Sequence, residues 1–277
     1  MPRWTAMTFW TPDDIPWHQF DRSRVDPDLL KLVKAASMVE FNAREYTRYL
    51  SNIFRDDPAF LALAGKWADS EVQHGQTLGR YAKLADRDFD FDGSFKRFTD
   101  GFRVPIDLTT SVRGSLTGEL LARCVVETGT SSYYTAIREA TSEPVLRALC
   151  SKIAADEMCH YKTFYELSKR YLEREKIGLG SRLRVVVGRV IESQDDELAY
   201  AYYAANSKDK TFDRKRNNQA YARRAYGLYP PYLVERICAM LFKIVGLRPH
   251  GRLNRFLGRQ GYLFMQKTSR RLAALGA

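Results

Sequence analysis

The fold of this chain is decided by the stretch ADSEVQHGQTLGRYAKL at residues 68–84 and by its counterpart KIAADEMCHYKTFYEL at residues 152–167. Each stretch has the apolar periodicity of a helix. Each also contains a Glu-x-x-His motif, formed by Glu71 and His74 in the first and by Glu157 and His160 in the second. Because residues three apart share one face of a helix, each motif directs a carboxylate and an imidazole to the same point.

A further glutamate precedes each motif at nearly the same distance. Glu40 lies 31 residues before Glu71, and Glu127 lies 30 residues before Glu157. Four helices would thus supply four carboxylates and two imidazoles, which is the ligand set of a di-iron or di-manganese carboxylate site. A single Glu-x-x-His is usually a solvated surface pair, but here two of the four histidines fall in register. The sequence therefore predicts a dinuclear metal site.

The remaining sequence predicts an all-α fold. Strand signals are scarce, and helical segments are separated by short breaks rich in Pro, Gly and Asp. The four helices that would carry the site are expected at about 28–54, 58–84, 111–140 and 144–176. Residues 86–109 contain two glycines and a proline, and they are long enough for a crossover connection between the second and third helices.

We expect three regions along the chain. They are an N-terminal extension over 1–27, the four-helix unit over 28–180, and accessory helices with a basic C-terminal region over 181–277. With 45% hydrophobic and 28% charged residues among 277, the composition excludes a disordered or collagen-like chain. The four cysteines form no CxxC pair, which indicates reduced thiols. No secretion signal or membrane-spanning stretch is visible, so we expect a cytoplasmic protein.

These motifs resemble those of the ferritin-like di-iron superfamily, most closely the soluble acyl-carrier-protein desaturases. Residues 68–84 and 152–167 look like the second and fourth ligand helices of that family, and VVETGTSSYY at 125–134 is similar to its third. The likeness covers about residues 28–176 and implies a ferritin-like four-helix bundle. It also implies two iron ions, or manganese or a mixed pair, with O2 as co-substrate. The implied metal ligands are Glu40, Glu71, His74, Glu127, Glu157 and His160.

The resemblance implies roles for two neighbours of these ligands. Asp156 stands where a carboxylate accepts the free ring N–H of His74 and fixes its tautomer. Thr130 stands near the oxygen-binding side, three residues after Glu127. The position that corresponds to Asp156 in the other half is Ser70, which departs from the acidic residue of the family. We therefore expect His160 to be held less firmly than His74, or by another group.

The function that this resemblance implies is O2-dependent oxidation of an organic substrate, by desaturation, hydroxylation or N-oxygenation. Electrons would come from an external, ferredoxin-like donor. From helical phase, we expect an apolar substrate slot near Cys124, Tyr134 and Phe164. A rubrerythrin-like or ferritin-like role in peroxide or iron handling ranks lower, as does a radical-generating subunit that would use Tyr134 or Tyr161.

The positive charge is concentrated in the last quarter of the chain. Residues 207–277 hold 16 basic and 3 acidic side chains, whereas residues 1–206 hold 28 and 30. In GRLNRFLGRQGYLFMQKTSRR, residues 251–271, large apolar side chains alternate with Arg and Lys. This region is either a solvated basic face or a surface for an acidic carrier protein or an anionic membrane. A nucleic acid is the least favoured partner of this region. If the protein is not an enzyme, we expect a scaffold whose basic tail binds a partner. The sequence also leaves a homodimer open.

Overall fold

The computed structural model describes residues 7, 10–192, 196–209 and 211–276. Helices make up 79% of the protein, and the described residues form no strand. The all-α prediction is therefore confirmed. No helix in the described part of the chain combines the length and the apolar character needed to cross a bilayer.

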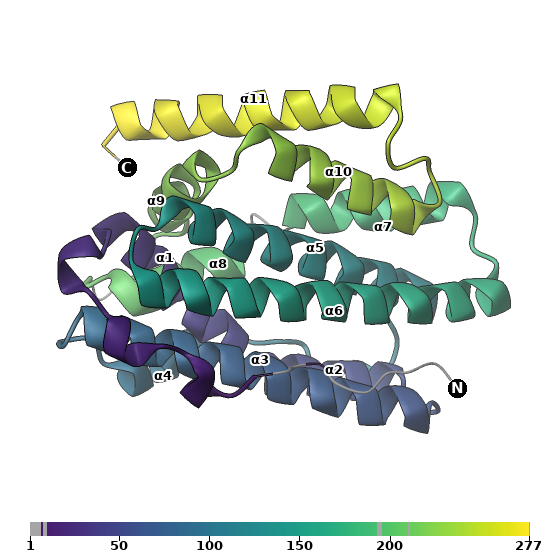
Figure 1. The fold of residues 1–277 in the computed structure, drawn as a ribbon. Helices are drawn as coiled ribbons and strands as arrows, with labels where there is room; N and C mark the ends of the chain where they lie inside the picture. The colour runs from purple at the N-terminus through teal and green to yellow at the C-terminus, as the bar shows by residue number, and fades with distance from the viewer. Residues whose placement is uncertain (1–6, 8–9, 193–195, 210, 277) are drawn as a thin grey trace.

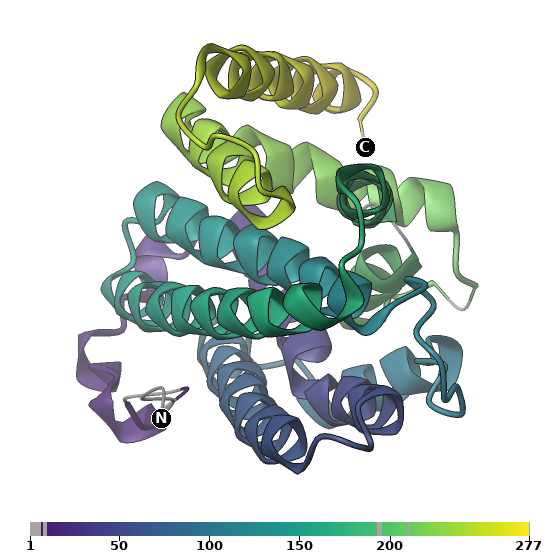
Figure 2. The same cartoon turned by 90° about the vertical axis from the view of Figure 1, so that its right-hand side faces the viewer.

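Four long helices carry the predicted ligands. They are α1 (Pro27–Phe41), α3 (Pro58–Ala85), α5 (Leu116–Ala140) and α6 (Pro144–Glu175). α1 packs along α3, α5 packs along α6, and α3 also contacts α6, which joins the two pairs (Figures 1 and 2). Each helix begins at a side-chain cap that accepts a hydrogen bond from a backbone N–H of the first turn, as helix starts require. The caps are Asp26, Asp57, Ser115 and Glu143.

The expected single helix over residues 28–54 is wrong at one point. α1 ends at Phe41, and α2 (Ala43–Ile53) begins beyond Asn42, whose backbone leaves the helical region at φ −81° and ψ 4°. The Asn42 amide donates to the Met38 and Val39 carbonyls at 3.2 and 3.1 Å. Asparagine has a weak helix propensity, so a break costs little there. As a result Glu40 lies in the last turn of α1 and not in the middle of a longer helix.

The crossover segment contains a helix of its own, α4 (Phe91–Gly101). The Asp90 side chain caps it by accepting from the Gly93 N–H at 3.0 Å. Two rings of α4 pack edge-on against Phe41 of α1, with centroid distances of 5.3 Å for Phe91 and 4.7 Å for Phe95. The connection from α3 to α5 is thus anchored beside the helix that carries Glu40.

Close packing of α3 against α1 depends on Gly75, the residue after His74. A Cβ atom at this position would lie 2.5 Å from the backbone nitrogen of Phe41. That distance is far below van der Waals contact, so only glycine allows the two helices to approach this closely. The same approach brings His74 of α3 toward Glu40 of α1.

The C-terminal helices cover the α1 and α5 side of the molecule. They are α7 (Leu179–Glu192), α8 (Asp196–Asn206), α9 (Arg214–Gly227), α10 (Pro231–Val245) and α11 (Arg252–Ala274). α8 and α9 pack on α1, and α7 and α10 pack on α5. α11 packs mainly on α9 and α10, as an outermost layer (Figures 1 and 2). α7 begins at Leu179, so the expected boundary at 180/181 falls within its first turn.

Candidate metal centre

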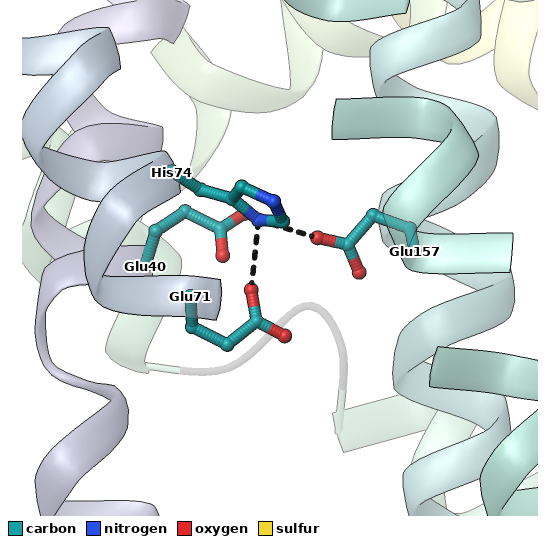
Figure 3. Close-up of side chains that lie close together, drawn as sticks. All are labelled: Glu40, Glu71, His74 and Glu157. Carbon is teal, nitrogen blue, oxygen red and sulfur yellow. Dashed lines mark hydrogen bonds and ion pairs between the residues drawn. The ribbon is translucent and has the colours of Figure 1, made fainter. Parts of the chain in front are cut away.

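The structure brings all six predicted ligands together in the interior, one or two from each of the four long helices. Side-chain ligand atoms lie within 4.8 Å of one another in two groups (Figure 3 draws the first). The first group is Glu40, Glu71, His74 and Glu157, and the second is Glu71, Glu127, Glu157 and His160. All six side chains are buried. Glu71 and Glu157 belong to both groups, so they lie where two adjacent positions would share ligands.

Glu71 and Glu157 each face both histidines. Glu71 places Oε2 at 3.1 Å from Nδ1 of His74 and Oε1 at 3.1 Å from Nδ1 of His160. Glu157 places Oε1 at 3.2 Å from Nδ1 of His74 and Oε2 at 3.7 Å from Nδ1 of His160. One oxygen of each carboxylate therefore points to each imidazole, which is the arrangement of a bridging ligand.

Several polar atoms of this cluster form no hydrogen bond of good geometry in the described part of the chain, although most of them lie at ion-pair distance from another member of the cluster. They are both carboxylate oxygens of Glu127, Oε1 of Glu157 and Nδ1 of His160. Unpaired buried polar groups are costly, and buried charges are normally paired or bound to a metal. These atoms all belong to groups that ligate divalent iron or manganese. The residues present thus fit a pair of such ions.

The outer nitrogen of His74 is held by an ordered carboxylate. Nε2 of His74 lies 3.0 Å from Oδ2 of Asp156, the contact expected from the sequence. The same oxygen accepts a hydrogen bond of 2.6 Å from the indole N–H of Trp10. The Trp10 ring also stacks on His74, with centroids 6.0 Å apart and planes 5° from parallel. A proton held on Nε2 by Asp156 leaves the Nδ1 lone pair directed at the cluster.

Trp10 is the site residue that the sequence did not predict. It lies in the expected N-terminal extension, where no helical periodicity marks it. Its backbone carbonyl accepts a 3.0 Å hydrogen bond from the Gln73 side chain, which fixes the segment beside His74. The only sequence signal is an aromatic residue in a short segment rich in tryptophan. The extension is therefore part of the site's wall and not an appendage.

The outer nitrogen of His160 meets a hydroxyl. Nε2 of His160 lies 3.1 Å from Oγ of Ser70, the residue that corresponds in sequence to Asp156. The sequence left open which group holds His160, and the structure shows that this group is the Ser70 hydroxyl. A neutral hydroxyl polarises an imidazole less than a carboxylate does. The two histidines therefore differ in the group that holds the outer nitrogen, a carboxylate for His74 and a hydroxyl for His160.

Two other predicted neighbours contact the ligands directly. The Thr130 hydroxyl donates to Oε2 of Glu157 at 2.7 Å. The Tyr134 hydroxyl donates to Oε1 of Glu40 in a short hydrogen bond. In contrast, the Tyr161 hydroxyl donates to the Met240 carbonyl at 3.3 Å, so it points toward α10 and away from the cluster.

The three residues expected to line a substrate slot are all buried, but they do not share one apolar cluster. Cys124 and Phe164 pack with Trp67, whose ring meets Phe164 edge-on at 5.9 Å. Tyr134 packs with a second apolar group that includes Ile153. The substrate-lining role of these residues stays a prediction.

Burial and the four carboxylates set the protonation of the cluster. Burial raises the pKa of Glu127 to about 8 and that of Glu40 well above its usual range. Burial also acts to raise the pKa of Glu71, but the charge and hydrogen bonds of His160 and His74 outweigh it and hold this pKa well below its usual range. The same two histidines, also against burial, lower the pKa of Glu157.

The pKa values of the two histidines are raised, in contrast to those of Glu71 and Glu157. Burial disfavours their charged form, but contacts to Asp156, Glu157 and Glu71 hold the pKa of His74 well above its usual value. Glu71, Glu127 and Glu157 do the same for His160. The raised pKa values of both histidines and the lowered pKa values of Glu71 and Glu157 thus favour positive imidazoles that face negative carboxylates in the metal-free cluster. Opposite charges that face one another in this way offset part of the cost of burying them.

Metal binding at this cluster should release protons. A metal ligand must be a neutral imidazole or an ionised carboxylate, whereas the raised pKa values of both histidines, Glu40 and Glu127 favour the protonated forms of these groups. We expect the affinity for Mn²⁺ to rise by about tenfold or more per pH unit between pH 6 and 8. Calorimetric titration in buffers of different ionisation enthalpy would count the protons released. An affinity that does not change with pH would contradict the assigned protonation.

Comparison with known proteins does not add to this geometry: no family model matches the sequence, and no curated protein matches it either.

Proposed function

We propose that the cluster binds two iron or manganese ions and that the protein is an O2-dependent oxidoreductase acting on an organic substrate. The observation that carries this proposal is the position of Glu71 and Glu157, each with one oxygen toward each histidine. Glu40 would then be a further ligand of the metal ion beside His74, and Glu127 would be a further ligand of the ion beside His160. On this proposal α1, α3, α5 and α6 form a ferritin-like bundle, with α4 in the crossover connection.

The chain's own residues support such chemistry. Bound between these side chains, a pair of iron ions supplies electrons and open coordination positions for O2. Asp156 orients His74 and keeps its proton on the outer nitrogen. Thr130 holds a hydroxyl proton beside Glu157. The buried apolar side chains on both sides of the cluster exclude water, which protects reactive oxygen chemistry from side reactions.

The first test is metal content. We expect about two iron ions per chain after anaerobic reconstitution with Fe²⁺ and gel filtration, because the cluster offers six ligands around two positions. Elemental analysis by mass spectrometry gives the stoichiometry. Failure to retain any iron or manganese would overturn the metal centre and the activity with it.

The second test is the reaction itself. Iron-loaded protein, a reductant and ¹⁸O2 are incubated with a lipid and metabolite extract, and the products are analysed by mass. Loss of two hydrogen atoms identifies desaturation, and gain of one labelled oxygen identifies hydroxylation or N-oxygenation. The same protein kept without O2 is the control. Iron-loaded protein that consumes O2 but changes no extract component would favour iron or peroxide handling instead.

A further inference from the structure

The outward face of α11 exposes five large apolar side chains. α11 forms the outermost layer, and its inner face is fixed closely on α10 because a Cβ at Gly258 would lie 2.9 Å from the Cα of Glu235 (Figures 1 and 2). The exposed side chains on the opposite face are Leu253, Phe256, Leu257, Leu263 and Phe264. Phe256 is 57% exposed and Phe264 is 58% exposed, which is unusual for phenylalanine on a soluble surface.

Apolar and basic side chains occupy different sectors of this face. At about 100° per residue, the five apolar side chains fall within a sector of about 120°. Four arginines lie within about 60° along one edge of that sector. They are Arg252, Arg255, Arg259 and Arg270. Lys267 and Arg271 project among the apolar side chains near the end of the helix.

The positive charge of α11 is not balanced locally. The helix contains no Asp or Glu. Among the residues that the structure describes, none of its Arg or Lys side chains forms an ion pair within 4.0 Å. In α9, by contrast, Arg223 and Arg224 both pair with Asp28 of α1. The charges of α11 are thus available to an external anion.

We propose that this outer face of α11 docks the protein on an anionic phospholipid bilayer. A helix that lies flat on a membrane buries its apolar sector about 5–10 Å into the boundary between headgroups and acyl chains, while basic side chains contact lipid phosphates. α11 offers both elements along one 23-residue helix that lies flat on the protein surface. The proposal does not depend on the metal centre.

Other occupants account for only half of this surface. A nucleic acid or an acidic protein would neutralise the arginines but would leave Phe256, Leu263 and Phe264 against polar atoms. A second copy of the chain packed through the same face would cover the apolar sector but would set two rows of unbalanced arginines against each other. An anionic bilayer satisfies both the apolar and the charged sectors.

Vesicle sedimentation tests the apolar sector. The full chain should sediment with phosphatidylcholine vesicles that contain about one-third phosphatidylglycerol and should stay in solution with pure phosphatidylcholine. We expect F256S/F264S to lower the partition coefficient on anionic vesicles about tenfold or more. The control is L108S/V112S, which removes exposed apolar side chains from the segment between α4 and α5, where Val112 is 57% exposed. Circular dichroism verifies that both variants stay helical.

A second pair of variants tests the charge. R252Q/R255Q/R259Q should lose most binding to anionic vesicles, whereas R55Q/R87Q/R103Q removes the same charge from exposed positions elsewhere and should retain it. Salt should weaken the binding of the wild type. Equal losses in the α11 variants and their controls would overturn the proposal. So would a wild type that ignores anionic vesicles but binds DNA or an acidic protein, or that forms a dimer which F256S/F264S dissociates.

Discussion

The variant His74→Ala/His160→Ala is expected to retain no iron or manganese and to remain folded. Each histidine is the only nitrogen ligand of its group, and its Nδ1 atom points at Glu71 and Glu157. Without either imidazole, the carboxylates alone bind iron weakly and in competition with water. The helices keep their caps and most of their apolar contacts, so the fold persists.

Thermal unfolding gives the size of the effect. A ligand that binds only the folded state at a thousandfold excess over its dissociation constant stabilises the protein by about 4 kcal/mol. For a chain of this size that corresponds to a rise in Tm of about 10 °C with added Mn²⁺. The double variant should show no rise.

The chain contains its own control for this experiment. His18 and His250 are the two other histidines, and both are exposed. The variant His18→Ala/His250→Ala should bind metal and gain thermal stability as the wild type does. His74→Gln/His160→Gln keeps more of the side-chain volume and serves if the alanine variant unfolds. Wild-type metal content in both buried-site variants would show that the ligands are misassigned.

Glu127→Gln is expected to stabilise the metal-free protein and to abolish the gain from metal. Both Glu127 carboxylate oxygens lack a hydrogen bond of good geometry among the described residues, with Nδ1 of His160 at 3.6 Å from Oε2, and burial raises the pKa of this group to about 8. A carboxyl whose pKa is higher in the folded than in the unfolded state supports folding fully below about pH 4.5, and that support is lost as pH rises through about 8. The glutamine carries no charge, so it avoids this loss.

The expected gain for metal-free Glu127→Gln is about 1–3 kcal/mol at pH 8, and it should shrink toward pH 5. Urea unfolding with a chelator at both pH values measures it. With Mn²⁺ present the wild type should be more stable than Glu127→Gln, because the variant lacks one metal ligand. The control is Glu119→Gln on the same helix, where the carboxylate accepts hydrogen bonds from Tyr49 and Ser111 at 2.8 and 2.7 Å. That variant should be less stable than the wild type under all these conditions.

Much of the arrangement could be predicted because it is local. Helix caps such as Asp26 and Asp57, each followed by a proline, are readable from sequence, and the spacing within Glu-x-x-His places each pair on one helical face. The matched intervals then placed Glu40 and Glu127 beside the two motifs, and the structure brings these residues together. The break at Asn42 was not predicted, because weak propensity at one residue leaves no clear signal. The helix within the crossover was not predicted either, because two glycines and a proline favour a break there, although Phe91, Phe95 and Phe98 recur at helical spacing.

The contacts that depend on distant residues could not be predicted. Trp10 reaches Asp156 across 146 positions of sequence, and nothing within the N-terminal segment marks it as buried beside His74. Ser70 looked like a missing carboxylate, yet its hydroxyl is the group that meets His160. In both cases the partner is set by how α3 and α6 pack, which periodicity does not specify.

The Trp10 contact also fixes an order of events during synthesis. Because domains fold as the chain emerges, Trp10 can contact Gln73 and His74 once α3 has left the ribosome, whereas its indole N–H has to wait for Asp156 on α6. At ordinary rates of translation that interval is about ten seconds. Throughout it, the indole N–H lacks its carboxylate acceptor. The hydrogen bond between Trp10 and Asp156 therefore forms only at the stage at which Glu157 and His160 of the same helix complete the ligand cluster.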